Sequence, residues 1–154
     1  MSRLARICLA VALSLPGSGF TATIIITDLE DVTFGDLPPT IQGVRQRMSF
    51  CVNSDPAGPF RLTAIGVENG RFEVFNGAQE AIPYQIYISR RRARLGREMF
   101  AGVTLNNLQA RRLRSNGRCR PPRIWLSVLL DETALSRAPA GNYTGTLQIT
   151  VAPE

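Results

Sequence analysis

The sequence predicts an all-β fold of two packed sheets. Three observations support this: short segments alternate apolar with polar side chains, Gly- and Pro-rich turns separate these segments, and no helical period continues over about ten residues. The chain has 154 residues, and a single core of about 100 to 150 residues is the commonest domain size. We therefore expect one β-sandwich domain, with no internal repeat and no second domain.

The first half of the chain contains five expected strand segments. Residues 23–27 and 32–34 form a first strand or strand pair, and the turn residues 35–39 end it. Residues 44–53 follow, with Met48, Phe50 and Val52 on one face and Cys51 on the other. After the turn at 54–59, strands are expected at 60–67 and 71–75. The Asn-Gly pair between them is typical of a short hairpin.

The second half continues the pattern. Residues 81–89 alternate strongly, and Pro83 favours an edge or bulge at their start. Residues 99–108 are a weaker strand candidate, and 109–122 read as a polar loop. Residues 123–130 carry apolar side chains on both faces, which is typical of a central, buried strand. One helical turn is expected within 131–140, before the final strand.

The final strand, within residues 140–151, is the most informative segment for function. One of its faces is apolar, formed by Tyr143, Gly145, Leu147, Ile149 and Val151. Only three residues follow Val151, so a sandwich that ends here leaves backbone groups and apolar side chains unpaired at this edge. We expect something else to cover the edge, although an ordinary C-terminal edge strand is an equal alternative.

The N-terminus has the pattern of a secretory signal. Arg3 and Arg6 precede an apolar run at residues 7–15, which Pro16 and Gly17 interrupt. Cleavage is expected after Gly19, with Ala22 as the second choice, which leaves a domain at residues 20–154. The run is shorter than the roughly 20 residues of a membrane span, and no transmembrane segment is expected elsewhere.

Two cysteines remain in the domain after removal of the signal. An even pair in an exported chain indicates a disulfide, here between Cys51 and Cys119. Closing a loop of about 67 residues contributes roughly 4 kcal/mol on the chain-entropy account. A structural role is expected, because the pair lacks the Cys-x-x-Cys spacing of redox sites.

The net charge of +6 comes entirely from arginine, because the chain has no lysine. One arginine cluster contains Arg90, Arg91, Arg92 and Arg94, and a second lies at residues 111–114. Neither cluster is interleaved with aromatic residues, so nucleic acid is not expected as a partner. A solvated loop is the first interpretation of each cluster. An acidic glycan, lipid headgroup or abiotic surface is the functional alternative.

The sequence offers little chemistry for catalysis. It contains no histidine, so Ser-His-Asp and Cys-His arrangements are impossible. Asp28, Glu30 and Asp31 lie close together but lack the glycine and terminal glutamate of a calcium loop. No enzyme, cofactor or metal site is expected.

Four segments taken together resemble the spore coat protein U domain family, whose members are subunits of archaic chaperone-usher pili. These segments, in the order of the family, are residues 32–36 (VTFGD), 48–51 (MSFC), 82–88 (IPYQIYI) and 140–151 (AGNYTGTLQITV).

The resemblance implies an immunoglobulin-like sandwich that lacks its final strand. It further implies a periplasmic pilus chaperone, an outer-membrane usher and other pilin subunits as partners, and export through the periplasm to the cell surface, with roles in adhesion and biofilm formation. A strand from a neighbouring chain would complete the sheet by β-strand addition. The groove for it would be lined by Tyr143, Leu147, Ile149 and Val151.

The sequence departs from the family at its N-terminus. Only about 14 residues separate Gly19 from Phe34, and none is cysteine, which points to a tip or minor subunit, although residues 23–27 could still act as a short donor. The rival hypothesis is a secreted or periplasmic binding module for an acidic ligand or surface, with a complete sandwich and the arginines of residues 90–94 as its contact site.

Overall fold

The computed structural model describes residues 22–32, 34, 43–76, 80–112, 123–139 and 141–154. These residues form two β-sheets and one short helix, α1 (Glu132–Arg137). The all-β sandwich expected from the sequence is confirmed. In the described part of the chain no helix is long and apolar enough to cross a membrane.

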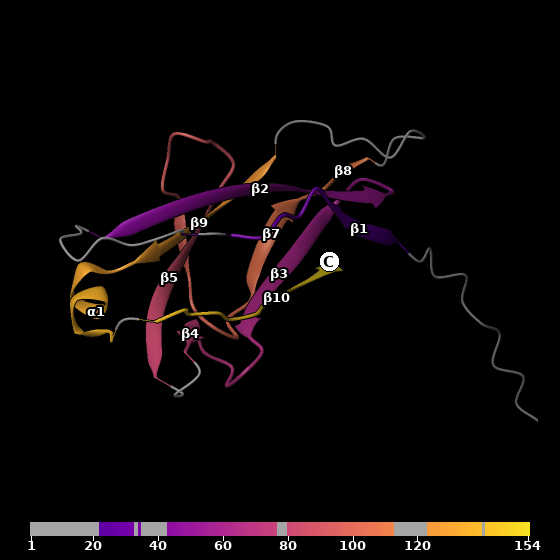
Figure 1. Ribbon diagram of the computed structural model, residues 1–154. Helices are drawn as coiled ribbons and strands as arrows, with labels where there is room; N and C mark the ends of the chain where they lie inside the picture. Colours follow the sequence, from indigo (N-terminus) through magenta and orange to yellow (C-terminus); the bar gives the residue numbers. More distant parts are fainter. Residues whose placement is uncertain (1–21, 33, 35–42, 77–79, 113–122, 140) are drawn as a thin grey trace, which may run out of the picture.

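The larger sheet carries most of the strands (Figure 1). Its order is β1 (Thr23–Thr27), β2 (Val44–Asp55), β9 (Ile124–Leu130), β5 (Ala81–Ser89) and β4 (Glu73–Phe75). Two short strands extend it: β6 (Arg97–Met99) pairs with β5, and β8 (Arg111–Arg112) runs parallel to β2. The smaller sheet has the order β10 (Leu147–Pro153), β3 (Pro59–Gly66) and β7 (Leu105–Gln109).

The core lies between the two sheets. In the larger sheet, Met48 of β2 is opposite Leu126 of β9, which is opposite Ile88 of β5, and all three are buried. From the smaller sheet, alternate residues of β3 are fully buried against them. The central position predicted for residues 123–130 is confirmed, because β9 lies between β2 and β5.

Two expected strands differ in the structure. Neither Val32 nor Phe34 belongs to a strand, and residue 33 lies outside the described part. The side chains of Val32 and Phe34 instead pack on the core as partly buried residues. The candidate at 99–108 is two strands, because a turn at Gly102 (φ 76°) moves the chain from β6 in one sheet to β7 in the other.

The Asn-Gly turn also differs from its expected role. Asn69 and Gly70 do not join a hairpin, because β3 pairs within the smaller sheet and β4 pairs with β5 in the larger one. Gly70 adopts φ 79° and donates its N–H to the carbonyl of Gly66. The turn therefore carries the chain between sheets.

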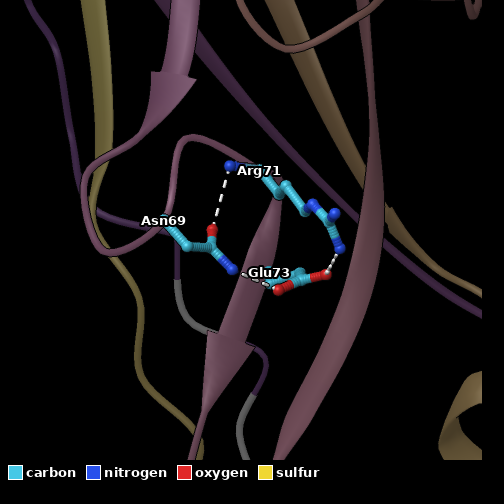
Figure 2. Close-up of polar contacts among 3 residues, drawn as sticks. All are labelled: Asn69, Arg71 and Glu73. Carbon is cyan, nitrogen blue, oxygen red and sulfur yellow. Dashed lines mark hydrogen bonds and ion pairs between the residues drawn. The ribbon is translucent and has the colours of Figure 1, made fainter.

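Polar contacts of Asn69 hold this crossover turn, as Figure 2 shows. Its Oδ1 accepts a hydrogen bond from the backbone N–H of Arg71 at 2.9 Å, and its Nδ2 donates to Glu73 Oε2 at 2.6 Å. Arg71 Nη1 lies 4.0 Å from the other carboxylate oxygen of Glu73. The side-chain amide thus bridges the turn and the start of β4.

Cys51 is buried in β2 and is disulfide-bonded. Its expected partner, Cys119, lies outside the described residues, as does the signal segment at residues 1–19. The pairing of Cys51 with Cys119 and the cleavage site therefore stay predictions.

Glycine at position 66 is required by the crossover, because a Cβ there would overlap the carbonyl oxygen of Arg71. We expect Gly66→Ala to lower the free energy of unfolding by about 2 kcal/mol, as for other overpacked sites. Gly58→Ala is the control, since a Cβ at Gly58 meets nothing within 4 Å; it should change stability by less than about 0.5 kcal/mol. Urea denaturation of both variants measures the difference. Equal effects would contradict the close approach.

The disulfide prediction is tested by peptide mass mapping without reduction. We expect a linked pair of peptides containing Cys51 and Cys119, and Cys51→Ser should lower the free energy of unfolding by roughly 4 kcal/mol. Detection of alkylated thiols at both positions in the unreduced protein would contradict the pairing.

Candidate functional site

The edge of the smaller sheet is formed by β10. Within the described residues its ladder partner is β3 alone, in register from Leu147 opposite Gly66 to Pro153 opposite Phe60. Leu147, Ile149 and Val151 pack against the core and are half-buried. Of the alternate residues, Gln148 and Thr150 are exposed and Ala152 is half-buried. The predicted apolar face is therefore present, and its backbone edge carries no ladder in the described chain.

The edge of the larger sheet beside it is formed by β1. Its ladder partner in the described chain is β2, with Ile24 opposite Ser54 and Ile26 opposite Val52. Ile24 and Ile26 are also partly buried members of the core. β1 lies next to β10 near the C-terminus (Figure 1), and the two strands belong to different sheets.

Tyr143 lies apart from the other three predicted groove residues. It precedes β10, and its hydroxyl donates to the carbonyl of Pro139 at 3.0 Å and accepts from Asn76 Nδ2 at 3.3 Å. The adjacent Thr144 pairs with Phe75 of β4, in the larger sheet. The final segment thus crosses between sheets before β10 begins, which the uninterrupted alternation in the sequence did not indicate.

The arginine run joins β5 to β6 as an exposed loop. Arg90, Arg91, Arg92 and Arg94 are all exposed. Arg92 is nevertheless held in place: its carbonyl accepts a hydrogen bond from Arg47 Nη1 at 2.8 Å, and its guanidinium carbon lies 5.5 Å from the ring centroid of Trp125. The sequence predicted an exposed loop here but not these two contacts, because Arg47 and Trp125 lie on strands that are distant in sequence from the loop.

Tyr84 has a raised pKa, and the cause is its packing in the fold. Its ring stacks on Phe72 with centroids 5.7 Å apart. Desolvation by burial, with a smaller contribution from the charge of Glu68, raises the pKa of Tyr84 to about 12. The phenol therefore loses its proton only at a higher pH than an exposed tyrosine does.

Among the acidic residues at 28–31, Asp28 is in an ion pair: its Oδ2 lies 3.2 Å from Arg123 Nη2. Among the described residues, no group of three or more carboxylates or cysteines is placed to hold a metal ion.

Among known proteins, the chain is similar in fold to a solved fimbrial structure. No family model matches the chain, and none of the curated proteins matches it. Among solved structures it is similar to a chain of a chaperone-tip adhesin complex, described as vital for synergistic activation of CFA/I fimbriae biogenesis, with a TM-score of 0.58 and 16% identity. The match covers 85% of this chain and 41% of that chain, so this protein spans less than half of its neighbour's length.

The contact between Arg92 and Trp125 gives a direct test of the loop's position. Arg92→Ser should lower the free energy of unfolding by about 0.5 to 1 kcal/mol, the range of exposed cation–π contacts. Arg91→Ser is the matched control and should stay within about 0.5 kcal/mol. Trp125 is the single tryptophan, so its fluorescence should change only in the Arg92 variant. An unchanged spectrum would show that the loop does not rest on the sheet.

Proposed function

We propose that this protein is a structural subunit of a chaperone-usher pilus, completed by a strand from another chain along β10. One observation carries the proposal: β10 and β1, adjacent strands at the edges of two different sheets, both expose part of the core. The half-buried residues are Leu147, Ile149 and Val151 on β10 and Ile24 and Ile26 on β1. The family resemblance and the fold of the fimbrial neighbour support the same function.

A docked strand would supply two interactions that the described part of the chain does not supply on this side of the sandwich. It would pair with the backbone edge of β10 opposite β3 and bury the exposed parts of the apolar side chains of β10. Burial stabilises by about 25 cal/mol per Å² of apolar surface. Because a domain has only about 5 to 15 kcal/mol of net stability, even two or three newly buried side chains change it substantially.

The short distance between β1 and β10 implies that β1 must move before a strand can dock on β10. Some Cα atoms of β1 and β10 lie within 8 Å of each other, whereas the two neighbours of an inserted strand are about 9.6 Å apart. A full ladder on β10 therefore requires β1 to move outwards by at least about 1.6 Å at these positions. The isolated subunit corresponds to a partly closed state that the incoming strand opens.

The pairing of β1 favours a tip or minor subunit. Thr23–Thr27 was the short donor candidate in the sequence, but in the structure it is a strand of its own subunit, paired over all five residues with β2. Donating it to a neighbour would remove this ladder and the packing of Ile24 and Ile26. We infer a subunit that accepts a strand without donating one, exported to the cell surface with a chaperone and an usher as assembly partners, and acting in adhesion and biofilm formation.

Donor-strand completion predicts stabilisation by a peptide. A peptide of alternating apolar residues, present at about one hundred times its Kd, should raise the melting temperature by roughly 10 °C. Ile149→Asp should abolish this gain, because it places a charge on the half-buried face of β10. Thr150→Asp is the control on the exposed face of the same strand, and it should keep the gain. Differential scanning fluorimetry with each variant measures the shifts.

A different outcome would support the rival hypothesis. If the protein without partners is a monomer that melts cooperatively at high temperature and gains nothing from any donor peptide, the sandwich is complete. The protein would then be a free binding module and not a pilus subunit.

A further inference from the structure

A second surface lies on the outer face of the larger sheet, away from the core. Strand register places its residues in rows across β2, β9 and β5, because alternate positions face outwards. The rows are Arg45, Leu129 and Gln85; then Arg47, Ser127 and Tyr87; then Ser49, Trp125 and Ser89. Ser127, in the middle of the central row, is buried. Arg123 continues this face beyond the start of β9, where its Nη1 donates to Ser49 Oγ at 3.2 Å.

The loop between β5 and β6 extends this surface. Figure 1 shows the loop rising on the side of β2 and β9, and the contacts of Arg92 with Arg47 and Trp125 fix it there. The loop arginines and the strand arginines therefore share one surface, which we call the arginine face. Its members are Arg45, Arg47, Arg90, Arg91, Arg92, Arg94 and Arg123.

The positive charge of the arginine face is largely uncompensated. Its ion pair in the described chain joins Arg123 to Asp28, and no described carboxylate lies within ion-pair distance of the other six guanidinium groups. Glu98, opposite Tyr87, is the acidic residue that strand pairing places on the same side. Five of these six arginines are exposed, and Arg47 is partly buried with its Nε out of contact with solvent. Six like charges held close together repel one another and create a field that attracts an anion.

We propose that the arginine face binds an acidic polysaccharide, a linear chain with carboxylate groups. Arg123 and Leu129, the partner of Arg45, are six positions apart along the chain, so the face is about 20 Å long. This length fits an extended polymer better than a single small anion. Guanidinium groups bind carboxylates through paired hydrogen bonds, and Gln85 and the hydroxyl of Tyr87 offer polar contacts for sugar hydroxyls.

The same surface is a poor match for a nucleic acid. Single-stranded binding needs open aromatic rings on which successive bases stack. On this face the guanidinium of Arg92 already lies over the ring of Trp125, which leaves Tyr87 as a single remaining ring among the named residues of the rows. The face therefore offers charge and hydrogen bonds without a series of stacking platforms, which favours the polysaccharide.

The proposal is tested by isothermal titration calorimetry with the purified folded protein. The ligand is alginate, a linear polymer of uronic acids, and neutral dextran is the comparison. We expect alginate to bind and dextran not to bind. The double variant Arg91→Ser, Arg94→Ser should weaken binding about tenfold. The matched control, Arg61→Ser with Arg137→Ser, removes two exposed charges elsewhere and should weaken binding less than twofold.

Three results would overturn the proposal: absence of alginate binding, an equal loss in both double variants, or equally tight binding of single-stranded DNA of similar charge. Equal losses would indicate attraction by net charge alone, and DNA binding would indicate an unselective polyanion surface. The inference does not depend on donor-strand completion, since the arginine face and the edge of β10 are on different sheets. Thr150→Asp, at an exposed position of β10, should therefore leave alginate binding unchanged.

Discussion

The antiparallel ladder of β2, β9 and β5 is the constraint on which the rest of the structure depends. Because side chains alternate along each strand, this one register sends Met48, Leu126 and Ile88 into the core. The neighbouring row, with Arg47 and Tyr87, faces outwards. A slip of one residue would exchange these sets, so the same hydrogen bonds determine the packed core and the charged outer face.

The two sheets are unequal, and this inequality produces the candidate docking edge. The smaller sheet has three strands, β10, β3 and β7, against a larger sheet ordered from β1 to β4. Its central strand β3 buries its inward side chains fully, whereas those of β10 remain half-exposed. The difference follows from position: β3 has a neighbour on each side, and β10 has one in the described chain.

The strands that the sequence predicted best are runs of apolar and β-branched residues. The expected strand at residues 81–89 coincides with β5, the one at 23–27 coincides with β1, and the central position of 123–130 is correct. Apart from the segment at 32–34, the errors described above occur where the chain changes sheet: at Asn69 and Gly70, at Gly102, and before Leu147. Local patterns predict a turn at such points but not which strand follows it in space, because the pairing partner is distant in sequence.

The sequence by itself determined the strand faces, the buried character of β9, the apolar stripe of β10 and the exposure of the arginine loop. These properties follow from side-chain period and polarity, which are local. Tertiary structure alone decided that Tyr143 lies off the stripe, that β1 pairs with β2 beside β10, and that Arg92 rests on Trp125. Each of these depends on contacts between residues at least 24 positions apart or on a change of sheet, and alternation within one segment carries no information about its partners.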